Sequence, residues 1–186
     1  ALDVLGGELI RDVEPGEVVI LRDDGVESYN LFEEKPAHCF FEYVYFSRPD
    51  SNLGNRYVYD TRREMGKTLY ENHGVETDIV SPVPDSGRSF ATGYAEAGDL
   101  EFVESLMKNR YVGRTFIMAT QKARETAVRL KLNAIKSNIE GKTVTLIDDS
   151  IVRGTTSKQL VKILRQSGAE EVHMRIGSPP IIAPCF

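Results

Sequence analysis

One segment, residues 144–156, constrains the fold most, because it joins an apolar run to two acidic residues and a glycine-containing turn. Its sequence is Val-Thr-Leu-Ile-Asp-Asp-Ser-Ile-Val-Arg-Gly-Thr-Thr. A short apolar run bounded by turn residues indicates a buried strand, here at residues 143–147. The apolar positions that follow, including Leu160 and Leu164, predict a helix that begins near Thr155 and ends at Gly168. A buried strand that leads directly into a helix is typical of α/β proteins.

The polar residues of this segment suit a sugar phosphate. Asp148 and Asp149 are costly to bury unpaired, and they suit ribose hydroxyls or a divalent cation such as Mg²⁺. Gly154, Thr155 and Thr156 supply backbone N–H groups and hydroxyls at a helix N-terminus, which suits a phosphate. The alternative is that these residues only turn the chain and cap the helix.

From residue 57 onward, helices and strands alternate. The patterns predict helices at 60–73, 87–97 and 120–139, and strands at 78–83 and 171–176. We therefore expect an α/β fold in which a mostly parallel sheet is flanked by helices. Ligands of such sheets bind beyond the carboxyl ends of the strands, which points to the loops after Val83 and Ile147.

Residues 1–35 differ from the rest of the chain. Apolar runs at residues 8–10 and 18–21 and the turn signal Asp24-Gly25 predict short strands and a hairpin. The sequence changes to an aromatic run after Pro36. We therefore expect one domain at residues 1–35 and a second at 36–186.

Two loops add groups that suit anions. Asp85, Ser86 and Gly87 follow the strand predicted at 78–83, and their backbone N–H groups could bind pyrophosphate, although an ordinary helix cap fits equally well. Residues 108–117, Lys-Asn-Arg-Tyr-Val-Gly-Arg-Thr-Phe-Ile, are basic in a chain whose net charge is −5. They could fold over a pyrophosphate and shield it from water. A solvated charged loop is the alternative.

Composition excludes several other classes. The negative net charge argues against a general nucleic-acid binder, which needs a basic surface. No run of 18 apolar residues predicts a membrane helix, and no signal peptide is visible at the start of the sequence. Two widely separated cysteines, Cys39 and Cys185, favour the reducing cytoplasm over a disulfide framework.

Three segments, residues 41–51, 108–117 and 148–156, together resemble the glutamine phosphoribosylpyrophosphate (PRPP) amidotransferases. The first reads Phe-Glu-Tyr-Val-Tyr-Phe-Ser-Arg-Pro-Asp-Ser, and the last is similar to the PRPP motif of type I phosphoribosyltransferases. The resemblance implies a type I phosphoribosyltransferase fold at 36–186 and a short β remnant of a glutaminase domain at 1–35. It also implies the first step of de novo purine biosynthesis, the transfer of ammonia to C1 of PRPP, which gives 5-phosphoribosylamine and pyrophosphate. A non-catalytic, PRPP-binding regulatory domain is the alternative.

The resemblance also implies roles for individual residues. The catalytic residues would be Asp148, Asp149, Lys108, Arg110 and Arg114. Substrate contacts would come from Asp85, Ser86, Gly87, Tyr111, Ser150, Arg153, Gly154, Thr155 and Thr156. Mg²⁺ would lie near Ser86, Asp148 and Asp149. Purine nucleotides would act as feedback inhibitors, and the intact parent would be a homo-oligomer.

The chain departs from the family pattern at its start, at its end and at Ala119-Thr120, which differs from the Pro-containing sequence common after the basic segment in the family. It begins with Ala1 where the family has a nucleophilic cysteine, so glutamine hydrolysis is not expected from this chain alone. It stops at Phe186, within a segment that continues in the family, so the phosphoribosyltransferase domain is expected to be truncated. Cys39 and Cys185 align with two ligands of a [4Fe–4S] cluster found in one branch of the family, and two free thiols are the simpler expectation here.

Overall fold

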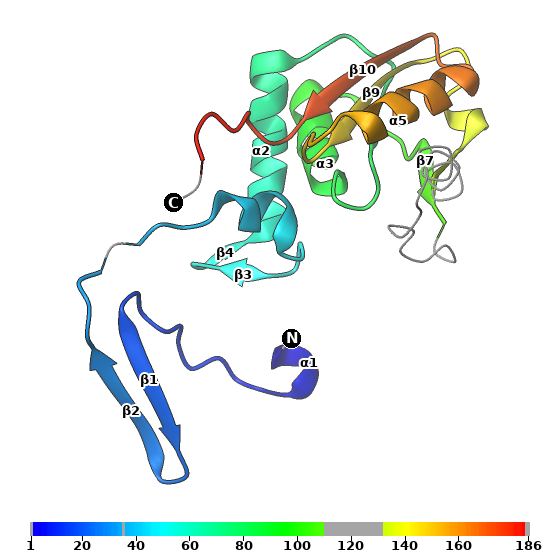
Figure 1. Cartoon of the computed structure of the whole chain (residues 1–186). Helices are drawn as coiled ribbons and strands as arrows, with labels where there is room; N and C mark the ends of the chain where they lie inside the picture. Colours follow the sequence, from blue (N-terminus) through cyan, green and yellow to red (C-terminus); the bar gives the residue numbers. More distant parts are fainter. Residues whose placement is uncertain (1, 35, 110–131, 185–186) are drawn as a thin grey trace, which may run out of the picture. The chain divides into compact units, whose positions relative to one another are not determined.

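The computed structural model (Figure 1) describes residues 2–34, 36–109 and 132–184. They divide into two compact units, Ala1–Cys39 and Phe40–Phe186. The first unit contains the short helix α1 (Leu2–Leu5) and an antiparallel hairpin of β1 (Glu17–Arg22) and β2 (Gly25–Asn30). The hairpin predicted from Asp24-Gly25 is confirmed. The strand predicted at residues 8–10 is wrong, because these exposed residues pair with no strand in the described part of the chain.

The second unit is built around a four-stranded parallel sheet, which confirms the predicted α/β fold. Its strand order is β10 (Glu171–Ile176), β9 (Thr143–Asp148), β5 (Ile79–Pro82) and β6 (Glu101–Phe102). The helical elements are η1 (Glu42–Phe46), α2 (Val58–His73), α3 (Arg88–Gly98), η2 (Lys136–Asn138) and α5 (Thr155–Gln166). Two short antiparallel pairs complete it: β3 (Asn52–Leu53) with β4 (Arg56–Tyr57), and β7 (Leu106–Lys108) with β8 (Leu132–Ala134). Among the described helices, none is long and apolar enough to cross a membrane.

Both faces of the sheet are buried. Successive strand residues point to opposite faces, so neighbours in β9 enter different apolar clusters. Leu146 packs in a cluster with Leu160 of α5, whereas Ile147 packs in a cluster with Phe90 of α3. Helix α2 packs beside α3, as Figure 1 shows. Burial on both faces explains why successive residues of the central strands are buried: all four in β5 and the last five in β9.

The strand register brings the functional loops together. Pro82 of β5 lies opposite Ile147 of β9, and Ile176 of β10 lies opposite Asp148. The three strands are parallel and therefore end at the same edge of the sheet. The loop after β5 and the segment after β9 both start at this edge.

One predicted helix is corrected by the structure. The pattern at residues 120–139 predicts a single helix, of which residues 120–131 lie outside the described part. From Leu132 onward the prediction is wrong, because Leu132–Ala134 pair as β8 with β7 and only a 3₁₀ turn follows. Leu132 and Ala134 are half-buried on either side of the exposed Asn133. Pairing with β7 therefore overrides a helical spacing that the apolar residues also fit.

Candidate functional site

The acidic pair lies at the carboxyl end of β9 and is buried. Asp148 is 8% exposed and Asp149 is 4% exposed. The segment after β10 fixes their backbone, because the N–H groups of Gly177 and Ser178 donate to the carbonyl oxygens of Asp148 and Asp149, both at 2.9 Å. The N–H of Asp149 also donates to Oδ1 of Asp148 at 3.0 Å. The backbone of both acids is thus fixed at the edge where the strands end.

The pKa of Asp148 is strongly perturbed. Burial and, to a smaller extent, the neighbouring charge of Asp149 raise the pKa of Asp148 to about 7. The hydrogen bond from the backbone of Asp149 opposes this rise only in part. Ligand-free Asp148 therefore keeps its proton to a much higher pH than an ordinary aspartate does. A bound cation, or hydroxyl donors from a sugar, would favour the charged form of Asp148.

A buried arginine, which sequence analysis did not identify, lies close enough for its charge to act on Asp149. Arg62 of α2 is 2% exposed, and its Nε and Nη2 donate to the carbonyl oxygens of Tyr43 and Ser47 at 2.6 and 2.9 Å. Burial lowers the pKa of Arg62, and the charge of Asp149 opposes that change. Arg62 therefore links η1 to α2 and contributes positive charge near the acidic pair. The signal in the sequence is a charged residue one turn before Gly66, on the buried face of a predicted helix.

The segment after the acidic pair ends in a free helix N-terminus. Gly154 has a φ of 69°, and α5 starts at the next residue with no side-chain cap among the described residues. The N–H of Lys158 donates to the carbonyl of Gly154 at 3.0 Å, so the first-turn N–H groups before it lack intrahelical acceptors. Thr155 and Thr156 are exposed beside them. These groups and the helix dipole suit a phosphate.

Two other predicted contacts lie between the acids and this helix. The hydroxyl of Ser150 donates to Oδ1 of Asp149, so this side chain supports the acidic pair in the ligand-free chain. Arg153 is exposed next to the helix N-terminus. Its guanidinium is therefore accessible to a ligand in solution.

The loop after β5 lies against the end of β9. The N–H of Val83 donates to the carbonyl of Ile147 at 2.8 Å, and the N–H of Gly87 donates to the carbonyl of Val83 at 3.0 Å. Asp85 is exposed and Ser86 is half-buried on this loop. The structure thus places the predicted pyrophosphate loop next to the predicted ribose site.

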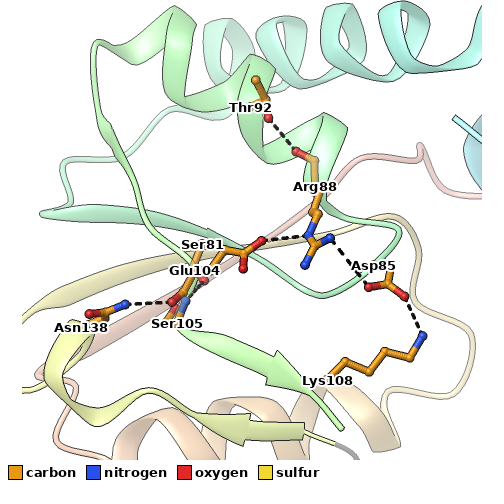
Figure 2. A network of polar contacts seen from close by, with 8 residues as sticks. All are labelled: Ser81, Asp85, Arg88, Thr92, Glu104, Ser105, Lys108 and Asn138. Atoms are coloured by element: carbon orange, nitrogen blue, oxygen red, sulfur yellow. Dashed lines mark hydrogen bonds and ion pairs between the residues drawn. The ribbon is translucent and has the colours of Figure 1, made fainter. Parts of the chain in front are cut away.

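The basic segment is described only at its start. Lys108 ends β7, and its Nζ lies 2.7 Å from Oδ2 of Asp85. Arg110, Tyr111 and Arg114 lie outside the described residues, so their roles stay predictions. A second residue that sequence analysis did not identify is Arg88, whose guanidinium lies between Asp85 and Glu104 (Figure 2).

The predicted iron–sulfur ligands are only partly described. Cys39 is an exposed free thiol, and Cys185 lies outside the described residues. A cubane cluster needs four ligands, so these two residues could supply at most half of them. The [4Fe–4S] cluster therefore stays a prediction.

The acidic pair fits a Mg²⁺ ion that is brought by a ligand. Within the described residues, no group of three or more His, Cys, Asp and Glu side chains could hold a metal by itself. Mg²⁺ prefers oxygen ligands, and it is often held by one or two carboxylates together with substrate phosphates and water. Two buried carboxylates close to a helix N-terminus that suits a phosphate meet that requirement.

A groove in the described structure reaches the end of β10 but does not include the acidic pair. It has a volume of about 780 Å³ and runs along α2 and residues 176–180. Its lining includes neither of the acids and no residue of the loop at 84–88. We place the site at the strand ends instead, because charge, free N–H groups and buried carboxylates converge there, whereas the groove lining is mainly apolar.

Comparison with known proteins identifies relatives along the whole chain. The chain is 56% identical over 187 residues to the amidophosphoribosyltransferase of Archaeoglobus fulgidus and 54% identical to that of Methanothermobacter thermautotrophicus. These alignments cover 100% of this chain but 41% and 40% of the relatives. The chain therefore spans about two fifths of the length of these curated relatives. No family model matches it.

Two solved structures have the same fold over nearly all of the chain, and both are 50% identical to it. One is a structure of the allosteric regulatory enzyme of purine biosynthesis, with a TM-score of 0.90 over 99% of this chain and 40% of that one. The other is the glutamine PRPP amidotransferase from B. subtilis complexed with ADP and GMP, with a TM-score of 0.89 over 100% of this chain and 41% of that one. The resemblance inferred from the three sequence motifs is confirmed.

Proposed function

Because the chain is related over its whole length to a part of the amidophosphoribosyltransferases, we propose that it binds PRPP and transfers ammonia to C1 of the ribose. One observation carries the proposal: a buried acidic pair lies at a sheet edge between a free helix N-terminus and a second polar loop. PRPP has a sugar between a phosphate and a pyrophosphate. The three parts of the site therefore correspond to the three parts of this ligand.

Each part of PRPP has a proposed set of contacts. The 5-phosphate binds the N–H groups and hydroxyls of Gly154, Thr155 and Thr156. The ribose hydroxyls donate to Asp148 and Asp149. The pyrophosphate lies against residues 84–87, with Lys108 nearby.

The reaction follows from this placement. The bond between C1 and the pyrophosphate oxygen breaks, and the lone pair of ammonia forms the new C1–N bond; a proton then leaves the nitrogen for solvent. Positive charge develops on the sugar, and the carboxylates of Asp148 and Asp149 stabilise it. Lys108 stabilises the charge that accumulates on the departing pyrophosphate, and the same role is predicted for Arg110 and Arg114. Mg²⁺, bound with the ligand, would neutralise pyrophosphate charge.

Further properties of the relatives extend to this chain as proposals. The B. subtilis structure holds ADP and GMP, and we propose purine nucleotides as regulatory ligands here too. We likewise propose a cytoplasmic, homo-oligomeric parent that makes 5-phosphoribosylamine for purine synthesis. A [4Fe–4S] cluster would need Cys39, Cys185 and two further ligands.

The direct test is pyrophosphate release from PRPP and Mg²⁺ with an ammonium salt at mildly alkaline pH, with glutamine in a parallel reaction. We expect release with ammonium, and saturation in PRPP. Asp148→Asn should weaken PRPP binding by about 1–3 kcal/mol, because a charged acceptor for the ribose is lost.

The control variant is Glu140→Gln. It removes one exposed carboxylate just before β9 starts, at the opposite end of the strand from the acidic pair, and should not change release. PRPP binding without release would favour the alternative, a regulatory PRPP-binding domain. A folded chain that binds no PRPP would contradict both functions.

A further inference from the structure

Asp85 pairs with two cations in the ligand-free chain. Its Oδ2 lies 2.7 Å from Nζ of Lys108, and its Oδ1 lies 4.0 Å from Nη1 of Arg88. Figure 2 shows the carboxylate between the two basic side chains, which come from β7 and from the first residue of α3. The carboxylate therefore neutralises positive charge from Lys108 and Arg88 next to the loop that is proposed to bind pyrophosphate.

A second acid completes the network. Nε of Arg88 lies 2.9 Å from Oε1 of Glu104, and the backbone carbonyl of Glu104 accepts a hydrogen bond from Nδ2 of Asn138 at 3.0 Å. The positive charges of Lys108 and Arg88 balance the negative charges of Asp85 and Glu104, so this group of four side chains has no net charge. An incoming polyanion would meet two repulsive groups together with the two attractive ones.

We propose that Asp85 is an intramolecular competitor for the pyrophosphate group, which holds Lys108 and Arg88 until the ligand displaces it. This inference rests on the proposed function, because it takes the loop at 84–88 as the pyrophosphate site. It changes the role of Asp85 from a ligand contact to a residue that weakens and tunes ligand binding.

Exposure makes such displacement feasible. The side chains of Asp85, Lys108 and Arg88 are 60%, 50% and 43% exposed. Exposed ion pairs are weak, because water and salt screen them and the long side chains lose freedom. A pyrophosphate carries several charges and can replace a single carboxylate. Glu104, which is 35% exposed and held through its backbone, would keep Arg88 in place during the exchange.

The test is the affinity for inorganic pyrophosphate, measured by calorimetry in buffer without Mg²⁺. Asp85→Asn should bind pyrophosphate about three- to tenfold more tightly than the unchanged chain at low ionic strength. The gain should shrink as salt is added, because screening weakens both the competition and the repulsion. When Lys108→Gln is also present, Asp85→Asn should change pyrophosphate affinity little, because Asp85 competes with pyrophosphate largely for Lys108.

Glu140→Gln is the matched control. Glu140 pairs with Lys136 at 3.0 Å, and both side chains are about as exposed as those of Asp85 and Lys108. This variant makes the same change in net charge and should leave pyrophosphate affinity within twofold.

The outcomes separate the inference from the proposed function. If the unchanged chain binds pyrophosphate and Asp85→Asn binds it equally or more weakly, Asp85 is a ligand contact or has no role in binding; the competitor proposal is then wrong and the proposed function stands. An equal gain in the Glu140→Gln variant would also overturn it, by tracing the effect to net charge. If neither the unchanged chain nor Asp85→Asn binds pyrophosphate while folded, both proposals fail.

Discussion

Gly87 packs against the carbonyl oxygen of Ile147 so closely that a Cβ atom at position 87 would lie 2.4 Å from that oxygen. The contact joins residues 60 positions apart and fixes the loop after β5 against the end of β9. It lies one residue from Asp148. The distance between the proposed pyrophosphate loop and the proposed ribose site therefore depends on a glycine.

Gly87→Ala should separate these two parts of the site. The added methyl group would push the loop away from β9, so PRPP affinity should fall at least tenfold and stability by about 1–3 kcal/mol. Calorimetric binding and chemical denaturation measure the two effects. Gly66→Ala is the control, because its Cβ would meet the carbonyl oxygen of Phe90 at 2.0 Å and disturb helix packing instead. If both variants lose stability but neither loses affinity, the loop does not bind the ligand.

Asp148→Asn should stabilise the ligand-free chain at alkaline pH. The pKa of Asp148 is raised to about 7 in the fold, from an ordinary value of 3.8, so folding favours the protonated acid. Its contribution to stability is complete below about pH 4 and is lost as pH rises to 7. The variant lacks the buried charge and should be more stable above pH 7 by on the order of 2–4 kcal/mol.

Urea denaturation in Mg²⁺-free buffer from pH 4 to pH 9 measures this difference. Asp50→Asn is the contrast, because hydrogen bonds from Arg48 lower the pKa of Asp50 and its removal should bring no gain at high pH. A gain for Asp148→Asn that is the same at every pH would contradict the assignment to a buried charge.

Arg62→Met should weaken both the fold and the site. The two carbonyl oxygens that Arg62 contacts would lose a charged donor, so stability should fall by about 2–4 kcal/mol. Asp149 would also lose the attraction of a nearby positive charge, which should weaken PRPP binding. Thermal denaturation and PRPP binding measure the two effects. Arg62→Lys keeps the positive charge but cannot donate to both carbonyl oxygens, so it should lose stability as Arg62→Met does but keep most of the affinity for PRPP. Equal losses of PRPP affinity in the two variants would contradict the electrostatic role of Arg62.

Two substitutions should separate the phosphate site from the pyrophosphate site. Thr156→Ala removes a hydroxyl at the N-terminus of α5 and should weaken ribose 5-phosphate binding about threefold to twentyfold while sparing inorganic pyrophosphate. Lys108→Gln should do the reverse. Calorimetry with each ligand measures four affinities. If either variant weakens both ligands equally, the two sites are not distinct.

Local chemistry determined much of this protein. The hairpin at Asp24-Gly25, helices α2, α3 and α5, and the strands that end at Pro82 and Asp148 follow from turn residues and apolar spacing. The position of the acidic pair at a strand end follows in the same way. These features depend on residues that are near one another in the sequence, so the local pattern of apolar and turn residues is enough to predict them.

The sheet order and its contacts required the tertiary structure. Placing β9 between β10 and β5 brings Gly87 to Ile147, and the packing of the helices brings Arg62 within electrostatic range of Asp149. Pairing with β7 likewise makes Leu132–Ala134 a strand, although their apolar spacing also fits a helix. These contacts join residues that are 24 to 87 positions apart. Which distant residues come into contact depends on burial and backbone hydrogen bonding across the whole domain. A local sequence pattern therefore cannot predict these contacts.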